Sequence, residues 1–391
     1  MEKKKALLLL TGGRSVPDML VIKHLRPDIA FNITTAQGLK DAKNLKDFSS
    51  SHFQCDIEVL LTIDPFNEQQ IKERCMEALL REPDAEWIMH FTGSPKVVGI
   101  YAHDIARERG IPLLFLDTAG EQVVSLIKAY ELDTGELFKA TVEEYVGAYG
   151  RTYEIPKSLS YREKAESWYP IAKVLALAPE ASQLLLTALR KAQDDKTPLT
   201  PNVNVQAEQL LEQLSDLGML TMIGKTADML QCTIKDHEGF EFLMGDWLEV
   251  YVWHEATNAG FADDCQWGYK IVVDQKIAAI LPSNELDLAL TYKARLLIAE
   301  CKTSRDPFDP KFLDKLYSIA NLVGGGYVRQ VFVTNCPYPQ KKNERFDNFS
   351  RQAEVRRISI VTGDQLFRVG TLLRQEIGAD SPKVLPTYGS H

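Results

Sequence analysis

The chain has 391 residues, more than one hydrophobic core usually organises, so its length predicts two or three domains. Hydrophobic residues make up 45% and charged residues 25%, an ordinary globular composition that excludes a disordered or fibrous chain. The formal net charge is −9, from 45 Lys and Arg against 54 Asp and Glu. Because phosphate contacts need local positive potential, such an acidic chain is not an obvious nucleic-acid binder.

The N-terminal sequence predicts a strand rather than a targeting signal. Its apolar run ends at Leu10 after one short strand length, and no small-residue cleavage site follows. No other stretch approaches the ~18 apolar residues of a membrane span. The six cysteines form no CxxC pair, which is typical of reduced thiols in a chain of this length. We expect a soluble cytoplasmic protein with no membrane partner.

Residues 1–155 predict a first domain in which short apolar runs alternate with amphipathic helical patterns. This alternation predicts an α/β domain of βαβ units in a mostly parallel, Rossmann-like sheet. A hairpin around Asp133-Thr134-Gly135 and a helix from Thr141 are expected to complete it. The predicted strands are 5–10, 28–33, 57–63, 87–91 and 112–116, and the predicted helices are 16–25, 67–80 and 97–109.

Two loops of this predicted sheet each follow a strand and lead into a helix: Thr11-Gly12-Gly13-Arg14-Ser15 and Thr92-Gly93-Ser94-Pro95-Lys96. Ligands of such sheets bind outside the carboxyl ends of the strands, near a topological switch point. Glycines let backbone amides approach a phosphate, helix N-termini favour anions, and hydroxyls, Arg14 or Lys96 can add contacts. Either loop alone is more often an ordinary turn, but two together favour a shared ligand site. GxGxxG and GxxxxGK[ST] motifs are absent, which disfavours dinucleotide redox chemistry and NTP hydrolysis.

Residues 156–235 predict a separate middle module. Helices are expected at 161–177, 179–191 and 205–218, with a loop of two prolines at 196–202. Residues 220–234 predict two strands that turn at Gly224. Helices followed by such a hairpin are typical of a winged helix. Winged modules inside multidomain chains are often structural, so we favour a winged-helix-like linker over a DNA reader.

Residues 236–391 predict a third domain with the element order αβββαβ followed by αβα. The expected helices are 245–256, 310–323, 343–355 and 363–375, and the expected strands are 266–273, 285–290, 294–302, 327–334 and 358–361.

The most informative residues of this domain are Asp287, Glu300 and Lys302. Alternation along a strand places Glu300 and Lys302 on one face, and a hairpin with the preceding strand can set Asp287 beside Glu300. Two adjacent carboxylates repel unless a cation joins them. With the backbone carbonyl of Cys301 as a further oxygen donor, the fitting ion is Mg²⁺ or Mn²⁺, which can activate water and orient a phosphodiester. Lys302 would then stabilise developing charge or position the water. The alternative is an ordinary surface Glu–Lys strand edge.

The position of Glu249 also favours a functional site in this domain. All six of its neighbours in Trp247-Leu248-Glu249-Val250-Tyr251-Val252-Trp253 are apolar, and on a helix it shares its face with apolar residues. A carboxylate there is costly to bury without a partner. Proximity to a metal site or to Lys302 would explain it, and a buried structural ion pair is the alternative.

A basic stretch supports the same site. Residues 300–357 contain 11 Lys and Arg against 7 Asp and Glu, a net of +4 within a chain of −9. Such a local excess can form a phosphate-facing rim, although charged helices are usually just solvated. The candidate rim residues are Lys341, Lys342, Arg345, Arg351, Arg356 and Arg357.

Glu249, Asp287, Glu300 and Lys302, on an αβββαβ order, resemble a PD-(D/E)xK nuclease of the restriction-endonuclease-like family. The resemblance implies that Asp287 and Glu300 bind the metal, that Lys302 is the catalytic lysine and that Glu249 is the helix carboxylate. Glu285 stands where the motif often has proline. The following helix, with Lys315, Tyr317 and Asn321, often lines the substrate groove in this family.

The whole layout resembles the CARF-domain effectors of type III CRISPR systems, with a Rossmann-like sensor, a winged-helix-like middle and a PD-(D/E)xK nuclease. The resemblance implies a homodimer whose sensors jointly bind a cyclic oligoadenylate, with cyclic tetra-adenylate expected, and allosterically activate cleavage. Substrates of this family include supercoiled DNA, single-stranded DNA and single-stranded RNA. The ligand-binding residues it implies are Thr11, Gly12, Arg14 and Ser15 in one loop and Thr92, Gly93, Ser94 and Lys96 in the other.

Two other functions stay open at this point. A nucleotide-sensing transcription regulator would use the middle module as its DNA reader, and would not need Asp287, Glu300 and Lys302. The second open function is a sensor that mainly degrades its own signalling ligand.

Overall fold

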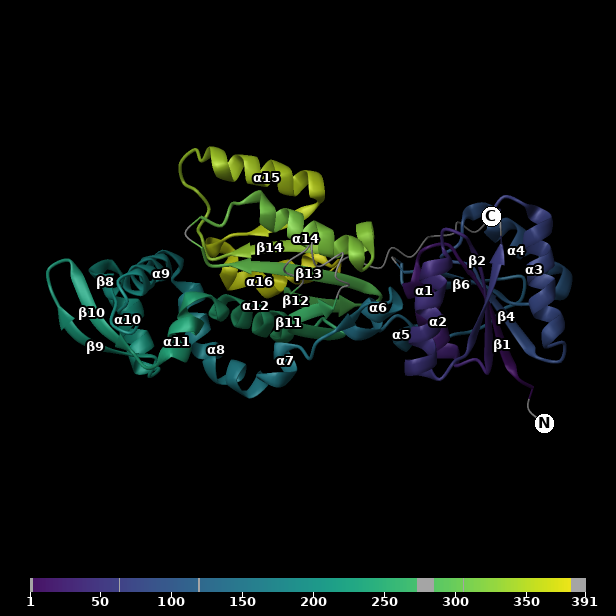
Figure 1. Ribbon diagram of the computed structural model, residues 1–391, viewed down its shortest axis with the longest axis horizontal. Coiled ribbons are helices and arrows are strands. Elements are labelled where there is room, and N and C mark those ends of the chain that lie inside the picture. Colours follow the sequence, from purple (N-terminus) through teal and green to yellow (C-terminus); the bar gives the residue numbers. More distant parts are fainter. Residues whose placement is uncertain (1–2, 63, 119, 273–284, 305, 381–391) are drawn as a thin grey trace, which may run out of the picture. The chain divides into compact units, whose positions relative to one another are not determined.

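The computed structural model describes residues 3–62, 64–118, 120–272, 285–304 and 306–380 (Figure 1). The chain forms two compact units, one made mainly of residues 1–152 with 291–295 and the other mainly of residues 153–290 with 296–381. The last residue of the strands predicted at 57–63 and at 266–273 lies outside the described residues.

The first unit is built on a six-stranded sheet in the order β3-β2-β1-β4-β5-β6. The first five strands run parallel, and β6 pairs antiparallel with β5. The predicted α/β domain with a Rossmann-like sheet is therefore confirmed. Its strands are β1 (Lys5–Thr11), β2 (Ile29–Thr35), β3 (Ile57–Thr62), β4 (Glu86–His90), β5 (Leu113–Asp117) and β6 (Gln122–Leu126).

Helices cover both faces of this sheet, because the buried strands alternate apolar side chains to each side (Figure 1). On one face Leu8, Leu10 and Phe31 pack against Ile71 and Ala102 of two helices. These two helices are α3 (Glu68–Arg81) and α4 (Lys96–Arg109), and the opposite face carries α1 (Ser15–Leu25), α2 (Leu39–Phe53) and α6 (Val142–Ala148).

One prediction for this unit is wrong. Asp133-Thr134-Gly135 does not turn a hairpin: Thr134–Leu137 is a short helix, α5. The Asp133 carboxylate accepts a hydrogen bond from the backbone N–H of Gly135 at 2.9 Å, so it caps this helix. The antiparallel partner strand is β6, which returns along β5 earlier in the chain.

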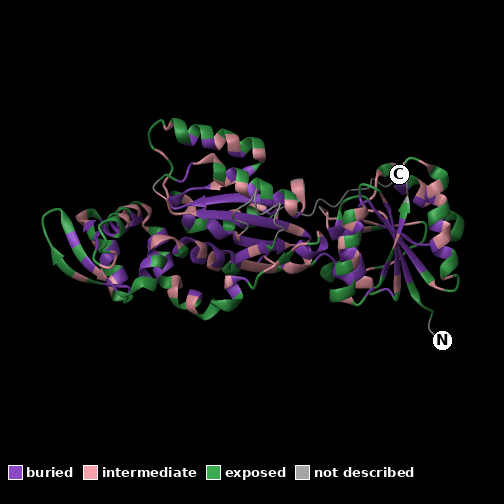
Figure 2. Cartoon of the chain, in the orientation of Figure 1, coloured by how far each residue is buried: buried purple, intermediate pink, exposed green. Residues whose placement is uncertain are grey.

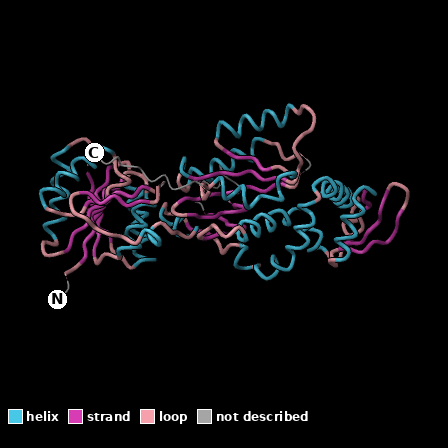
Figure 3. Tube along the Cα trace, turned by 180° about the vertical axis from the view of Figure 1, so that it is seen from behind, coloured by secondary structure: helices cyan, strands magenta, loops and turns pink. Residues whose placement is uncertain are grey.

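The second unit begins with a helical part and a three-stranded sheet in the order β8-β10-β9. In Figure 3, the hairpin of β9 and β10 extends away from the helices. The hairpin does not turn at Gly224, because β9 continues to Lys225; the turn is closed at Thr226, whose N–H donates to the carbonyl of Met229 at 2.8 Å. The helices are α7 (Lys157–Ser160), α8 (Arg162–Leu177), α9 (Pro179–Asp194) and α10 (Glu208–Asp216), and the strands are β8 (Asn202–Asn204), β9 (Leu220–Lys225) and β10 (Met229–Ile234).

Among the described residues, no single helix is both long and apolar enough to cross a membrane. In the same described part of the chain, only α8 and α9 taken together have that length and composition, and they are bent by 108° at their junction.

The rest of this unit is a second six-stranded sheet in the order β15-β14-β13-β12-β11-β7, in which β13, β14 and β15 run parallel. Its central strands are buried along most of their length (Figure 2). The strands expected in residues 236–391 are thus all found in this sheet, with β7 as an additional edge strand. The strands are β7 (Thr152–Tyr153), β11 (Asp264–Val272), β12 (Glu285–Tyr292), β13 (Arg295–Lys302), β14 (Val328–Thr334) and β15 (Ile358–Val361).

The helices of this part occur in the predicted order. The first predicted helix starts later than expected, because a π-helical turn at Phe242–Asp246 links it to a short preceding helix. The predicted final helix begins with a 3₁₀ segment at Gly363–Arg368. The helices are α11 (His237–Glu241), α12 (Trp247–Asn258), α14 (Pro310–Leu322), α15 (Glu344–Arg356) and α16 (Val369–Glu376).

Candidate functional site

The neighbouring strands β12 and β13 bring Asp287, Glu300 and Lys302 together. Asp287 and Glu300 are both buried, with 5% and 1% of their surfaces exposed. Lys302 Nζ lies 2.6 Å from Glu300 Oε1 and 3.5 Å from Asp287 Oδ2. Strand alternation aims Glu300 and Lys302 the same way, as the sequence predicted. The lysine ammonium therefore lies where it neutralises both carboxylates.

The backbone of β13 also contributes to this cluster. The N–H of Cys301 donates to Asp287 Oδ2 at 2.6 Å, and the carbonyl of Cys301 accepts a hydrogen bond from Lys302 Nζ at 2.9 Å. Burial and the nearby charge of Glu300 raise the pKa of Asp287 to about 6, against the lowering effect of Lys302. Burial and the proximity of Glu300 therefore outweigh the lysine contacts and favour the protonated form of Asp287.

A second lysine holds the other oxygen of Glu300. Lys315, on α14, lies with its Nζ 2.7 Å from Glu300 Oε2. Phe312, one turn earlier on the same helix, places its ring 5.3 Å from Lys302 Nζ. α14 thus forms one wall of the cluster, and Lys315 was predicted only as a groove residue.

Glu249 lies in the first turn of α12, directly after the π-helical turn. Its Oε2 accepts a hydrogen bond from Trp267 Nε1 at 2.9 Å and lies 3.8 Å from Lys157 Nζ. Lys157 is also 2.9 Å from Glu285 Oε1. The partner of Glu249 is therefore Lys157, which the sequence did not reveal because it comes from a distant helix.

The electrostatics of Glu249 link it to the cluster on the strands. Burial and repulsion from Asp287 raise the pKa of Glu249 to about 8, although Lys157 and the Trp267 hydrogen bond act in the opposite direction. The carboxyl group is thus poised to change its proton occupancy near neutral pH, as groups at functional sites often do.

The donor chemistry of the cluster fits a hard divalent cation. The two carboxylates of Asp287 and Glu300 and the carbonyl of Cys301 are all oxygen donors, which Mg²⁺ and Mn²⁺ prefer. Within the described ranges, however, no three side chains of His, Cys, Asp or Glu are grouped closely enough to hold an ion. Glu249, held by Trp267 and Lys157, does not join the other two carboxylates.

Several residues of the predicted basic rim are engaged with neighbouring groups. Arg356 pairs with Asp314 at 2.6 Å, and Arg345 pairs with Asp306. Arg351 donates from Nε to the carbonyl of Asp347 at 3.2 Å. Lys342 lies 3.8 Å from Glu344 on the exposed surface. These ion pairs offset part of the local positive charge.

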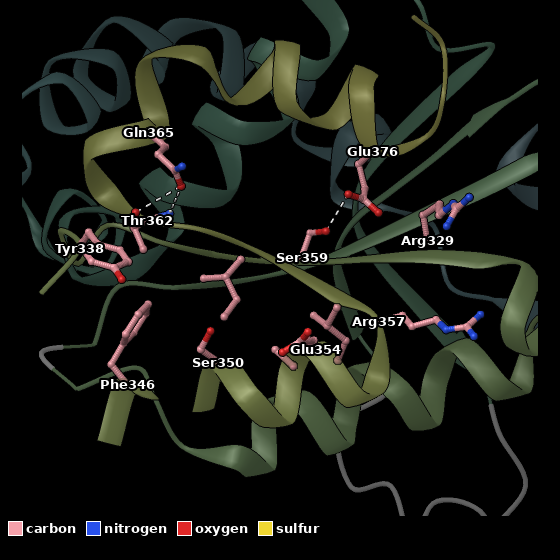
Figure 4. Close-up of a pocket in the computed structure, with 13 residues that line it drawn as sticks. Arg329, Tyr338, Phe346, Ser350, Glu354, Arg357, Ser359, Thr362, Gln365 and Glu376 are labelled. Atoms are coloured by element: carbon pink, nitrogen blue, oxygen red, sulfur yellow. Dashed lines mark hydrogen bonds between the residues drawn. The ribbon is translucent and has the colours of Figure 1, made fainter. Parts of the chain in front are cut away.

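A cavity of about 660 Å³ lies over β15, between α15 and the segment that leads into α16 (Figure 4). Tyr338 and Phe346 stand at one end, and Arg329 and Arg357 at the other. Hydrogen bonds from Ser359 to Glu376 and from Thr362 to Gln365 cross its wall. None of the predicted catalytic residues lines this cavity.

In the first unit, the two predicted ligand loops leave the carboxyl ends of β1 and β4, which are adjacent strands. The order β3-β2-β1-β4 makes this junction the topological switch point of the sheet. The loops touch: a Cβ on Gly12 would lie 2.6 Å from the carbonyl oxygen of Gly93, and a Cβ on Gly93 would lie 2.9 Å from that of Arg14. Only glycine permits this approach, so the structure brings both loops together.

The hydroxyls of these loops face inward. Thr11 Oγ1 donates to Asp18 Oδ2 at 2.7 Å, and Thr92 Oγ1 lies 2.7 Å from His90 Nε2. Ser94 donates to the carbonyl of Phe91 within its own loop. Ser15 is fully buried, and its Oγ has no partner among the described residues. The side chains of Arg14 and Lys96 are exposed, beside the N-termini of α1 and α4.

Asp18 and His90 were missed by the sequence analysis. Both are fully buried, and His90 Nδ1 lies 2.8 Å from Asp18 Oδ1. An aspartate in the apolar helix sequence of α1 and a histidine ending an apolar strand were the available signals, since neither is usually buried without a partner.

Residues 236–377 match the family described as "Card1-like, endonuclease domain". This range contains Glu249, Asp287, Glu300 and Lys302. No curated protein matches the sequence.

Several solved structures share the fold. Can2 from Sulfobacillus thermosulfidooxidans, solved in complex with cyclic tetra-adenylate, is 19% identical and aligns over 95% of this chain and 97% of its own, with a TM-score of 0.72. Protein VC1899 from Vibrio cholerae is 19% identical over 96% of this chain and 98% of its own, with a TM-score of 0.71.

A type III CRISPR defence DNA nuclease activated by cyclic oligoadenylate is 18% identical, with a TM-score of 0.51 over 88% of this chain and 48% of its own. The chain thus shares its fold with Can2 over nearly its whole length, and its residues 236–377 match the Card1-like endonuclease domain family.

Proposed function

We propose that the chain is a metal-dependent nuclease that cleaves or nicks DNA in CRISPR antiviral defence and is activated by a cyclic oligoadenylate. The observation that carries the proposal is the buried cluster of Asp287, Glu300 and Lys302 within the Card1-like endonuclease domain. The relatives that share the fold support it, since one was solved with cyclic tetra-adenylate and another is a DNA nuclease activated by cyclic oligoadenylate.

At the proposed catalytic centre, Asp287, Glu300 and the carbonyl of Cys301 would hold Mg²⁺ or Mn²⁺. Such an ion supplies Lewis acidity and an activated water for phosphodiester hydrolysis. Lys302 already contacts both carboxylates, so its ammonium is close enough to stabilise negative charge on a phosphate bound beside them. Lys315 holds the second oxygen of Glu300 and orients that carboxylate. Glu249, whose pKa is raised to about 8, would accept or release a proton near neutral pH.

In the proposed sensor, the two touching loops at the switch point bind the cyclic ligand. Backbone N–H groups beside Gly12 and Gly93, the N-termini of α1 and α4, and the exposed cations Arg14 and Lys96 suit its phosphates. We further propose that the protein acts in the cytoplasm as a homodimer, because a cyclic tetra-adenylate with two-fold symmetry matches a two-fold interface. Single-stranded RNA would be a second substrate.

The experiment that tests this function incubates the purified chain with supercoiled plasmid, Mn²⁺ or Mg²⁺, and cyclic tetra-adenylate. Nicking that needs both ion and ligand is expected. Parallel reactions with single-stranded DNA and single-stranded RNA define the substrate. Absence of cleavage with each ion and with cyclic tri-, tetra- and hexa-adenylate would refute the proposal. Sequence-specific duplex binding without ion or cleavage would instead support a transcription regulator, and loss of intact ligand without nucleic-acid cleavage would support a ligand-degrading sensor.

A further inference from the structure

A chain of three hydrogen bonds, two of them buried and the third partly buried, joins the two proposed ligand loops. It starts at Thr11 after β1, passes through Asp18 of α1 and His90 at the end of β4, and ends at Thr92. The successive distances are 2.7 Å from Thr11 Oγ1 to Asp18 Oδ2, 2.8 Å from Asp18 Oδ1 to His90 Nδ1 and 2.7 Å from His90 Nε2 to Thr92 Oγ1. We name these four residues the relay.

The chemistry of its members sets the direction of these bonds. A carboxylate only accepts, so Thr11 donates its hydroxyl proton to Asp18, and His90 donates from Nδ1. In the neutral form of the ring, His90 Nε2 accepts the hydroxyl proton of Thr92. The same hydroxyl oxygen accepts the backbone N–H of Leu116 on β5 at 2.7 Å. The Thr92 hydroxyl therefore connects the relay to the backbone of the next strand.

Breaking any hydrogen bond of the relay would destabilise the folded chain. Asp18 and His90 are completely buried, and an unpaired charge or polar group in that position would be strongly destabilising. Each member satisfies its neighbour, so removing one hydroxyl leaves a buried group on another element without its partner. A disturbance at Thr11 would thereby reach Thr92, which belongs to the other loop.

The inward orientation of both threonines changes their role in the site. Thr11 is 2% exposed and its hydroxyl proton is used by Asp18, so its side chain is not positioned to contact a ligand. The loops can contact phosphates through their backbone N–H groups and their exposed cations. The positions of these groups depend on the conformation of the two loop backbones. The glycine contact between Gly12 and Gly93 shows that the two backbones already touch.

We propose that Asp18 and His90 are positioning residues that couple the two loops, so that they bind the cyclic oligoadenylate as one site. The inference rests on the proposed function for its ligand, and on the relay geometry alone for the coupling. Breaking the relay at either end should disable both loops together.

A double-mutant cycle on the full-length chain tests the effect on the ligand. Thr11→Val and Thr92→Val each remove a hydroxyl at nearly constant volume, and each is expected to weaken the affinity for cyclic tetra-adenylate about tenfold, as for one lost buried hydrogen bond. The double variant should lose about tenfold as well, since either change already breaks the relay. Independent loops would instead give about a hundredfold loss, which would overturn the proposal. Ser49→Ala, which removes another buried hydroxyl of the same unit, is the control and should bind normally.

Hydrogen exchange of the ligand-free chain tests the coupling without any ligand. Thr11→Val should increase amide exchange in residues 92–96, and Thr92→Val should increase it in residues 11–15, each by about tenfold. Increases confined to the substituted loop would refute the coupling even if cyclic tetra-adenylate binds. If these cross-loop increases occur in a chain that binds no cyclic oligoadenylate, the coupling stands and the proposed ligand is wrong.

Discussion

The ammonium of Lys157 lies 3.8 Å from Oε2 of Glu249, the helix carboxylate of the candidate active site. The lysine reaches this position along Gly268, where a Cβ would lie 2.6 Å from its side-chain carbons. It also pairs with Glu285 at 2.9 Å and lies 5.8 Å from the ring of Trp267. Lys157 therefore offsets the negative charge of Glu249 and Glu285, which lie beside the cluster on β12 and β13.

Replacement of Lys157 by methionine should destabilise the fold at pH 8. The variant keeps an apolar stem of similar length against Trp267 but leaves Glu249 and Glu285 without their shared cation. Because the lysine is partly exposed, we expect a loss of about 1–2 kcal/mol in the free energy of unfolding, measured by urea denaturation. Lys164→Met is the matched control, since Lys164 lies over Trp168 and pairs with exposed Glu238; its loss should stay within about 0.5 kcal/mol. Equal losses in both variants would contradict the assignment.

The raised pKa of Glu249 predicts a pH-dependent stability. Its pKa rises from the usual 4.5 to about 8 in the folded chain, so the folded state holds a proton that the unfolded state has released. The stabilisation from this proton is fully present below pH 4.5 and is lost as the pH rises through about 8.

In the absence of divalent cations, the free energy of unfolding of the wild type should fall between pH 5 and 9 by on the order of a few kcal/mol more than that of Glu249→Gln. Urea denaturation at intervals of one pH unit measures both curves. Parallel curves for the two proteins would mean that Glu249 has an ordinary pKa.

Replacement of Lys302 by methionine should abolish cleavage while leaving ligand binding intact. Its ammonium contacts both carboxylates, and loss of one such electrostatic contact costs about 10²–10³-fold in rate. Lys311→Met is a close control, because Lys311 lies over the same Phe312 ring, at 5.1 Å, but pairs with Asp309. Plasmid nicking at saturating cyclic tetra-adenylate compares the two variants. Comparable activity in both would show that the catalytic centre lies elsewhere.

Replacement of Gly12 by alanine should weaken ligand binding. The new Cβ would lie 2.6 Å from the carbonyl oxygen of Gly93 and 2.8 Å from Pro95 Cδ, so the loops must separate. We expect at least a roughly tenfold loss of affinity for cyclic tetra-adenylate by calorimetric titration, with the cleavage rate at saturating ligand unchanged. Gly224→Ala adds the same methyl group where the nearest atom is 3.8 Å away, and should behave as wild type. An unchanged affinity in Gly12→Ala would argue against this loop as part of the ligand site.

Local patterns carried most of the fold prediction. The buried strands of both large sheets are short apolar runs, and their alternation with helices is visible in the sequence. Helix α2 was missed because its apolar residues are few and three serines follow one another, although Ala42, Leu45 and Phe48 line its buried face. At Asp133 the same residues can begin a turn or cap a helix, and only the tertiary setting decides between them.

The candidate active-site cluster was predictable because its geometry is local. Alternation along β13 and a single neighbouring strand are enough to bring Asp287, Glu300 and Lys302 together. The partners of Glu249 and Asp18 could not be predicted from the sequence. A carboxylate in an apolar helix indicates that a partner exists but does not identify it. His90 lies 72 positions from Asp18 along the chain, and Lys157 precedes β11 and α12 altogether.

The π-helical turn at Phe242–Asp246 determines where this helix can lose a residue without moving Glu249. A π turn contains one residue more than an α turn would, and here Thr303 binds the carbonyl of Met244 in the widened turn at 3.0 Å. Because the widened turn absorbs this extra residue, its removal would leave an ordinary α turn and keep Glu249 facing Trp267. A one-codon deletion at this turn should therefore leave the candidate site in place, whereas the same deletion just after it, within α12 before Glu249, would turn Glu249 by about 100° relative to the preceding helix.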